Sequence, residues 1–396
     1  MSIPAIAQDN KAEVIHWWTS GGESAAVKVF ADQFGKAGGA WVDSAVAGGV
    51  NARTAAINRT IAGNPPAAMQ FNTGKQFDEL VEGGLLTDID AVATANNWKA
   101  NLPQALIDAT TRQGKMFAAP VNIHGQNWLF YNKELLAKVG AKEPRNWDEA
   151  IEALDKIKAS GAIPLAFSGA KNWERLLFNA VLVDKGGPAI WSAFWAKRDP
   201  AVLKSPELRK AADTYKKLKD YTDPGASSRV WNDATGLVIQ GKAGMQIMGD
   251  WAKGEFSAAG KAPEKDYGCV ILASGSHGFI FGGDVFAFPK LKDANAAKAQ
   301  ALLAKTMLDP AAQIEFSLKK GSLPARLDVD ASRLDACAQK GMKYVLDKNQ
   351  QLPSDVMLAP PAVWGAIEDV ISQFWNTAMT SEQFIDKLAV AFKQNQ

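Results

Sequence analysis

The 396-residue chain is poor in cysteine and histidine, with two of the former and three of the latter. Cys269 and Cys337 form neither a disulfide framework nor a CxxC metal or redox pair. A bridge between them across a long loop, formed in an oxidising compartment, and two buried free thiols are equally consistent with the sequence. The histidines lie far apart and without carboxylates at helical spacing, so we expect no metal site and no cofactor.

An excess of charge and a long apolar run are also missing. The 44 basic residues nearly balance the 42 acidic ones. A nucleic-acid-binding protein carries a basic surplus that neutralises phosphates, so we expect no nucleic-acid partner. No apolar run approaches the roughly 20 residues that a membrane-spanning helix needs, and we therefore expect a soluble protein.

The N-terminal segment carries a weak export signal. Residues 5–7 read Ala-Ile-Ala and precede a glutamine, which is the small-x-small pattern of a signal-peptidase site. Neither a basic segment nor an apolar core precedes this pattern. We expect an exported, periplasmic protein whose signal peptide has been removed or truncated.

The first third of the chain alternates between two hydrophobic periods. Expected strands cover 14–18, 40–46 and 67–71, and expected helices cover 24–34, 52–62 and 77–82. Ser20 and Glu23 have the spacing of a capping box at the start of the first helix. This alternation predicts an α/β fold with parallel βαβ units and helices on both faces of the sheet.

From residue 116 the pattern changes. Expected strands cover 116–120 and 126–131, and a long helical tract follows, with helices over 133–139, 147–160, 174–184, 189–196, 206–218 and 232–240. Strands return over 243–248, 268–272 and 286–288, before a mostly helical tail from residue 294. A second lobe that begins near residue 122, with strand structure again near 285, predicts two lobes joined by several crossovers.

Two of the 13 tryptophans, Trp17 and Trp18, stand at the end of the first expected strand. Ligands of open α/β sheets bind outside the carboxyl ends of the strands, which makes these indoles candidate stacking surfaces. Adjacent strand residues point to opposite faces, so the two side chains cannot enter one core layer. Core packing is the alternative, and these residues alone do not decide between the two.

Motifs for nucleotide binding and nucleophilic catalysis fail in detail. The stretch "GLVIQGKA" at 236–243 resembles a phosphate loop, but Ala243 replaces the hydroxyl residue that holds magnesium. The stretch also reads as a helix before a strand, which is the reverse order. "GSHG" lacks the flanking glycine of a nucleophile elbow. Glu23 and Asp284 are the candidates for a glycosidase pair, although a helix cap and a turn explain them equally well.

Three stretches in order resemble the family 1 extracellular solute-binding proteins, the sugar receptors of bacterial ABC importers. They are "GKMFAAPVNIHGQNWLFYNKELLAKVGAKEPRNWDEAIEALDKIK", "LVIQGKAGMQIMGDW" and "KKGSLPAR". The opening "HWWTSGGE" is similar to the glucose-binding branch. Together the similarity covers most of residues 12–376.

The resemblance implies a two-lobe periplasmic binding protein fold with a hinge and an interlobe ligand cleft. We expect one lobe at 12–121 plus 284–326 and the other at 122–283 plus 327–396. A monomer of this kind captures a small sugar, delivers it to the ABC permease subunits, and meets the membrane only through that permease. It needs no cofactor and no catalytic residue, so we expect no enzyme.

The resemblance also implies ligand-binding residues, namely Trp18, Glu23, Gln70, Asn72, Trp231, Trp251, Asp284 and Lys320. We add Trp17, beside Trp18, and Asn122 and His124, near the expected crossover. Indoles stack on the C–H face of a pyranose, and charged or amide groups bind its hydroxyls. Each keeps a structural alternative: core packing for the tryptophans, strand-end hydrogen bonds for the amides, and a solvated position for Lys320.

One departure concerns the sugar itself. The glucose-binding branch places a histidine on the sugar near the position that Met357 occupies here, and Asn72 stands where relatives carry a cationic or imidazole group. A glucose-like monosaccharide is expected, but another hexose, a pentose, a deoxy sugar or an apolar-substituted sugar fits as well. A secreted carbohydrate-active hydrolase and a chemosensory binding protein without a transporter are the alternative functions.

Overall fold

A computed structural model describes residues 10–273 and 278–394, and its chain divides into two compact units. Unit 1 contains residues up to 123 and residues 283–334, and unit 2 contains residues 124–282 and those from 335 onward. The chain thus passes between the units after residues 123, 282 and 334, where the sequence suggests 121, 283 and 326. The signal-peptidase pattern at residues 5–7 lies outside the described residues.

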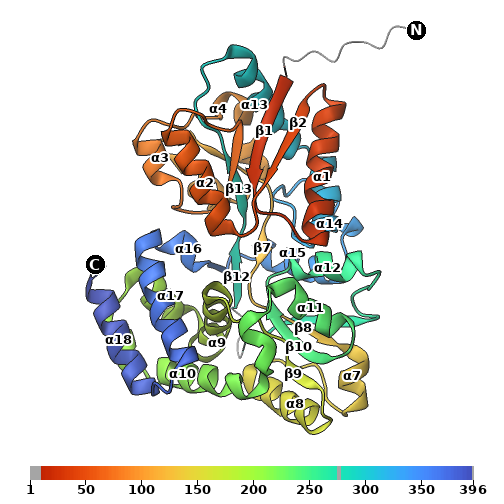
Figure 1. Cartoon of the computed structure of the whole chain (residues 1–396), viewed down its shortest axis with the longest axis vertical. Coiled ribbons are helices and arrows are strands. Elements are labelled where there is room, and N and C mark those ends of the chain that lie inside the picture. Colours follow the sequence, from red (N-terminus) through yellow and green to blue (C-terminus); the bar gives the residue numbers. More distant parts are fainter. Residues whose placement is uncertain (1–9, 274–277, 395–396) are drawn as a thin grey trace. The chain divides into compact units, whose positions relative to one another are not determined.

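Unit 1 is built on a five-stranded sheet (Figure 1). Its strands, in spatial order, are β2 (Ala40–Ala45), β1 (Lys11–His16), β3 (Ala68–Asn72), β13 (Asp284–Ala287) and β6 (Ala118–Pro120). β1 pairs in parallel with β2 and β3, which confirms the parallel units predicted from the sequence. β13 runs antiparallel to both β3 and β6. The small ribbon of β4 (Thr111–Arg112) and β5 (Lys115–Met116) stands apart from this sheet.

The capping box predicted at the first helix is present. The Ser20 hydroxyl accepts from the Glu23 N–H, and the Glu23 carboxylate accepts from the Ser20 N–H. This cap starts α1 at Gly21, three residues earlier than the apolar spacing suggests. The helices of unit 1 are α1 (Gly21–Lys36), α2 (Gly49–Ile61), α3 (Asp78–Glu82), α4 (Asp90–Ala95), α5 (Trp98–Asn101), α6 (Gln104–Thr110), α13 (Ala294–Met307) and α14 (Pro310–Lys320), with a 3-10 turn at Ala331–Arg333.

Helices cover both faces of this sheet, as β13 illustrates. Val285 and Ala287 belong to the hydrophobic cluster that α2 and α3 complete. Phe286 points to the other face, where it contacts Trp18. On that face α1 packs along α14, and Phe30 stacks on Phe316 with ring centroids 4.3 Å apart (Figure 1).

Unit 2 contains two sheets. The larger one has the order β11 (Tyr267–Ile271), β8 (Trp128–Asn132), β10 (Ala243–Met248) and β9 (Ile163–Leu165). The smaller one has the order β14 (Gln351–Pro353), β12 (Phe279–Gly282) and β7 (His124–Gly125). β8 is antiparallel to β10 and β11, whereas β9 and β10 are parallel.

Most of unit 2 is helical. Its helices are α7 (Lys133–Lys138), α8 (Trp147–Ala159), α9 (Lys171–Trp191), α10 (Pro206–Leu218), α11 (Trp231–Ile239), α12 (Ala252–Ala258), α15 (Ala336–Leu346), α16 (Asp355–Leu358), α17 (Pro361–Asn376) and α18 (Ser381–Gln394). A π-helical turn at Ser192–Lys197 and 3-10 turns at Pro200–Lys204, Lys219–Tyr221 and Pro224–Ser228 link them.

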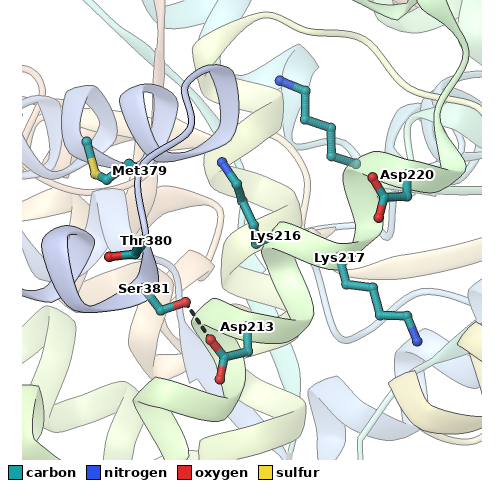
Figure 2. Close-up of a pocket in the computed structure, with 8 residues that line it drawn as sticks. Asp213, Lys216, Lys217, Asp220, Met379, Thr380 and Ser381 are labelled. Atoms are coloured by element: carbon teal, nitrogen blue, oxygen red, sulfur yellow. Dashed lines mark hydrogen bonds between the residues drawn. The ribbon is translucent and has the colours of Figure 1, made fainter.

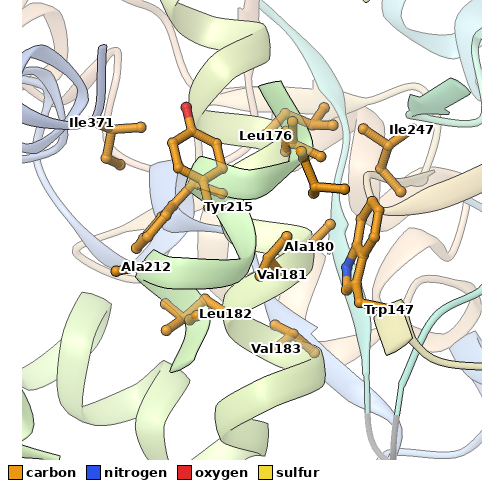
Figure 3. Packing of buried hydrophobic residues seen from close by; sticks show 14 of the residues in the cluster. Trp147, Leu176, Ala180, Val181, Leu182, Val183, Ala212, Tyr215, Ile247 and Ile371 are labelled. Carbon is orange, nitrogen blue, oxygen red and sulfur yellow. The ribbon is translucent and has the colours of Figure 1, made fainter. Parts of the chain in front are cut away.

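The core of unit 2 is a large buried cluster, to which α9 contributes Leu176 and the run 180–183 (Figure 3). Tyr215 of α10 and Trp147 of α8 belong to the same cluster. The helix expected over 174–184 lies within α9, whereas the one expected over 189–196 covers the end of α9 and the π-helical turn that follows it. Gly187 has a φ of 65°, which interrupts the helical backbone before Pro188.

None of the helices in residues 10–273 and 278–394 is long and apolar enough to cross a membrane.

A disulfide bond joins Cys269 of β11 to Cys337 of α15, 68 residues apart in the chain. The sequence left this bond and two free thiols equally open. The bond ties the first turn of α15 to an edge strand of the larger sheet of unit 2.

Replacing both cysteines with serine should lower the free energy of unfolding by about 4 kcal/mol, because a loop of this length gains much conformational freedom when the bond is absent. Urea unfolding of the double variant tests this expectation. The wild-type protein in a reducing agent is the control and should behave like the variant. An unchanged urea midpoint in both samples would show that the bond contributes nothing to stability.

Candidate functional site

Four of the expected ligand-binding residues of unit 1 meet at one end of its sheet. β3 ends at Asn72, and β13 begins directly opposite at Asp284. Just after the end of β1, the Trp17 N–H donates to the Gln70 side-chain oxygen over 3.0 Å. These contacts place Trp17, Gln70, Asn72 and Asp284 at the end where the parallel strands finish, which is where open α/β sheets bind ligands.

The bond to Trp17 fixes the orientation of the Gln70 amide. Its oxygen is occupied, so its Nε2 donors point the other way. Within the part of the chain that the structure describes, neither the buried Gln70 Nε2 nor the buried Thr73 hydroxyl has a hydrogen-bond partner. Buried donors without a partner are costly, and a ligand acceptor relieves that cost. Thr73 was not a sequence candidate, because a threonine after a strand carries no distinctive signal.

Asn72 is engaged within unit 1. Its side-chain oxygen accepts from Gln76 Nε2 over 3.3 Å and from Arg53 Nη1 over 3.4 Å. Its own N–H donates to the Gln76 oxygen over 2.9 Å. The Arg53 guanidinium lies over the Trp17 ring, 5.6 Å from its centroid. Asn72 therefore makes strand-end hydrogen bonds, as its structural alternative expects. Its contact with a ligand stays a prediction.

Asp284 is 3% exposed and is held by Asn122. The Asn122 Nδ2 donates to Asp284 Oδ2 over 2.9 Å, and the Asp284 N–H donates to Asn122 Oδ1 over 2.7 Å. This reciprocal pair sets the direction of the carboxylate. Asn122 was expected as a ligand contact, and the structure gives it at least this second, positioning role.

Glu23 and Lys320 form a buried ion pair. Lys320 Nζ lies 3.1 Å from Glu23 Oε1, while Glu23 Oε2 accepts from the N–H groups of Thr19 and Ser20. Lys320 is the last residue of α14 and is 2% exposed, so it is not the solvated surface lysine of the structural alternative. Removing one member of a buried pair leaves an uncompensated charge and costs about 3–5 kcal/mol.

Trp18 lies in the core of unit 1 and not at the end of a strand. β1 ends at His16, two residues earlier than expected, because the His16 ring accepts from the Trp18 N–H over 3.2 Å and turns the chain. The Trp18 indole is 1% exposed and contacts Phe286 and Phe316. Core packing, which the sequence left open, therefore explains Trp18, whereas Trp17 is only half-buried.

The turn after β1 is held by His16. Its Nε2 lies 2.8 Å from Asp43 Oδ1 on β2, so that nitrogen is the donor and Nδ1 is the acceptor for Trp18. Burial alone would raise the pKa of Asp43, but hydrogen bonds from His16 and Trp41 outweigh it and leave that pKa below its usual value. The pair keeps Trp17 facing Gln70.

In unit 2, Trp231 and Trp251 both contact a third tryptophan. The Trp173 ring centroid lies 6.4 Å from that of Trp231 and 5.8 Å from that of Trp251. All three indoles are half-buried, and Gln246 of β10 donates to the Trp231 carbonyl. Trp173, at the start of α9, was counted in the sequence without a role, because helical spacing does not show which distant aromatics a tryptophan will meet.

His124 belongs to the same aromatic group. Its ring meets Trp251 edge-on with centroids 5.0 Å apart. Its Nδ1 lies 2.5 Å from Asp250 Oδ1, while Asp250 Oδ2 accepts from the Gly125 N–H over 2.9 Å. Asp250 directly precedes Trp251 in the chain, and it was not among the candidates selected from the sequence.

Met357 is half-buried on the short helix α16, next to a buried charge cluster. Arg175 Nε lies 3.1 Å from Asp355 Oδ2 and 3.2 Å from Glu368 Oε2, and the guanidinium stacks on Trp364 at 4.6 Å. Burial raises the pKa of Glu368, only partly offset by Arg175, and the Asp355 charge adds to the rise. The cluster joins α9, α16 and α17 and so fixes the helix that carries Met357.

A surface cavity of about 380 Å³ in unit 2 is lined by lysines that cap a helix (Figure 2). Lys216 Nζ donates to the Phe374 and Thr377 carbonyls, and Lys219 Nζ donates to the Trp375 carbonyl. These lysines satisfy the free carbonyls at the C-terminus of α17. None of the expected ligand-binding residues lines this cavity. We therefore interpret its lysines as caps of α17 and not as ligand contacts.

Among residues 10–273 and 278–394, no three histidine, cysteine, aspartate or glutamate side chains are grouped so as to hold a metal ion.

A family model described as "Bacterial extracellular solute-binding protein" matches residues 18–314. The chain belongs to this family. A "Probable sugar-binding periplasmic protein" of Brucella melitensis is 39% identical over 99% of this chain and 94% of its own length. The family resemblance found in the sequence is thereby confirmed.

Two solved structures show the same fold. A "Chitin oligosaccharide binding protein" superposes with a TM-score of 0.83 at 20% identity, covering 97% of this chain and 98% of its own. The bacterial solute receptor AcbH superposes with a TM-score of 0.81 at 18% identity, with the same two coverages. They confirm the mixed α/β fold of two-lobe solute-binding proteins.

Gly249→Ala should displace the Trp251 indole, because a Cβ at residue 249 would lie 2.1 Å from a ring carbon. The near-ultraviolet circular dichroism of the tryptophans should therefore change while the far-ultraviolet spectrum stays the same. Gly365→Ala, inside α17 with no atom within 4 Å of the new Cβ, is the control and should leave both spectra unaltered. Identical near-ultraviolet spectra for both variants would contradict this geometry.

Proposed function

We propose that the protein is the substrate-binding component of an ABC importer, which captures a monosaccharide in the periplasm and delivers it to the permease. The observation that carries this proposal is the division of chemistry between the units. Unit 1 offers polar groups at the end of its sheet, and unit 2 offers half-buried indoles. The name of the Brucella melitensis relative, a probable sugar-binding periplasmic protein, supports the same assignment.

A pyranose has two kinds of surface, and the two residue sets suit them. The C–H faces of the ring stack on indoles such as Trp231 and Trp251 and displace water from both surfaces. The hydroxyls bind Asp284, whose carboxylate accepts, and the Gln70 Nε2 group, which donates. We therefore propose a neutral sugar, which uses both kinds of contact, as the ligand.

Several features favour a single sugar ring, such as glucose or a related monosaccharide. AcbH is described as having an exclusive preference for β-D-galactopyranose, whereas the chitin oligosaccharide binding protein is named for a longer ligand. The fold alone therefore does not decide the length of the ligand. Gln70 and Asp284 are almost fully buried, which suits a ligand enclosed on all sides. The apolar Met357 side chain would also suit a sugar that carries an apolar substituent.

The carboxylates considered for hydrolysis have structural partners. Glu23 caps α1 and pairs with Lys320, and Asp284 is paired with Asn122. A glycosidase needs one carboxyl group that donates a proton and a second that attacks or activates water. We therefore propose a monomeric receptor without catalytic activity, and the hydrolase alternative predicts that bound sugar is consumed.

The direct test is titration of the purified protein with D-glucose, D-galactose, D-xylose, L-arabinose, maltose and chitobiose, followed by tryptophan fluorescence and then by calorimetry. Saturable one-to-one binding of a monosaccharide, recovered unchanged after hours, is the expected result. Binding of the disaccharides alone would overturn the monosaccharide assignment. Slow conversion of the sugar would instead support the hydrolase.

Gln70→Glu is the variant to compare in this titration. It keeps the oxygen that accepts from Trp17 but loses the Nε2 donors, so sugar affinity should fall about tenfold or more, as expected for a buried hydrogen bond worth about 1–3 kcal/mol. Gln104→Glu, exposed on α6 of the same unit, is the matched control. Trp18→Ala is unsuitable, because a cavity at this core position would cost about 3–5 kcal/mol of stability and confuse binding with folding.

A further inference from the structure

The residues on either side of Trp251 contact both points where the chain enters unit 2 from unit 1. His124 is the first residue of unit 2 after one passage, and Asp335 is the first after another. Asp250 Oδ1 lies 2.5 Å from His124 Nδ1. Lys253 Nζ lies 2.8 Å and 3.1 Å from the two oxygens of Asp335. The four-residue segment 250–253 thus joins a candidate sugar-stacking indole to two chain passages.

The contact through Asp250 is rigid. Besides the His124 ring, its carboxylate accepts from the Gly125 N–H over 2.9 Å, and its own N–H donates to the Gly125 carbonyl over 3.0 Å. Asp250 is 1% exposed, so water competes little for these bonds. The beginning of β7 therefore cannot shift without moving the residue that precedes Trp251.

The contact through Lys253 is a buried ion pair, since Lys253 is almost completely shielded from solvent. Burial alone would raise the pKa of Asp335, but the Lys253 charge and N–H donors at the start of α15 outweigh it and leave that pKa below its usual value. Asp335 also caps α15 by accepting from the Ala338 N–H over 2.8 Å. Two residues after Asp335, the disulfide of Cys337 ties α15 to β11, so this passage ends on a fixed helix.

Unit 1 shows the same arrangement around Asp284. Asn122, which forms the reciprocal pair with Asp284, precedes the first passage by one residue. Asp284 itself is the second residue after the passage that follows residue 282. The two segments also run in close contact, since a Cβ added to Gly283 would lie 2.3 Å from the Asn122 carbonyl oxygen. In each unit, then, a candidate ligand residue is bonded to a segment that connects the units.

We infer that Asp250 and Lys253 are positioning residues, which join Trp251 to the two passages so that sugar contact and the relative movement of the units depend on one another. The inference rests on the proposed function of Trp251 as a sugar-stacking residue. A ligand shifts a conformational equilibrium only through a difference in affinity between the two states. The bonds of Asp250 and Lys253 to the connecting segments are the route by which Trp251 contacts the sugar differently in the two states.

The test measures the distance between the units in solution with Lys253→Met and Asp250→Asn. Spin labels are attached at Ile61→Cys in unit 1 and Val390→Cys in unit 2, both exposed, because the two native cysteines are bonded and do not react. Pulsed electron paramagnetic resonance records the distance distribution without sugar and with D-glucose, and calorimetry gives the affinity. Lys185→Met is the matched control, because it removes the ion pair of Lys185 with the buried Asp184 in unit 2, just before the break of α9 at Gly187.

Both test variants should show a broader distance distribution without sugar and an affinity about tenfold lower than that of the control, a change of about 1.4 kcal/mol. Lys253→Arg keeps the charge and should restore both properties, which a general loss of stability would not allow. Distributions and affinities equal to those of Lys185→Met would overturn the inference. If the wild-type protein fails to respond to D-glucose, the proposal of a glucose-like ligand fails, while the sugar-free distributions still decide the roles of Asp250 and Lys253.

Discussion

The register between β3 and β13 is the constraint on which the polar set of unit 1 depends. It places Asp284 opposite Asn72 and Phe286 opposite Gln70. A slip of one residue would turn Asp284 to the other face of the sheet and move Phe286 away from Trp18, to the face that α2 and α3 cover. The packing of Phe286 on Trp18 therefore fixes the position of the Asp284 carboxylate in this unit.

Asp284 arrives at this position from a distant part of the chain. Strands β1 and β3 lie within the first 72 residues, whereas β13, which pairs with β3, follows the whole first part of unit 2. The antiparallel direction of β13 brings its first residues to the same end of the sheet at which β1 and β3 finish. Within each unit, bonds therefore join the segments that connect the units to residues in or beside the candidate ligand set, through Asn122 in unit 1 and through Asp250 and Lys253 in unit 2.

Local patterns in the sequence predicted much of the secondary structure. Helix 206–218 and strand 243–248 match the structure to the residue, because Ser205 caps the first and the second is a continuous run of buried residues. The capping box at Ser20 was correct for the same local reason. The first strand was predicted to begin three residues too late and to end two residues too late. Its end is set by His16, whose partner Asp43 lies on the neighbouring strand.

The candidate site was predictable in its residue types but only partly in its geometry. Tryptophans and amides at strand ends indicated the end of the unit 1 sheet at which Trp17, Gln70 and Asn72 lie. The sequence did not show that Trp18 faces the core, because that depends on Phe286 and Phe316, which come more than 260 residues later. Asp250 and Trp173 were missed because their partners are brought together by tertiary packing, for which an isolated sequence carries no period.

If the polar set of unit 1 and the indoles of unit 2 act on one bound sugar, both should respond to it together. Hydrogen–deuterium exchange of the intact protein, measured with and without the monosaccharide that binds in the panel, detects such a joint response. We expect slower exchange at residues 70–73 and 283–285 of unit 1 together with residues 249–253 of unit 2, all at the same sugar concentration. Slower exchange confined to one unit, or to segments outside these ranges, would contradict the proposal that both sets bind one sugar.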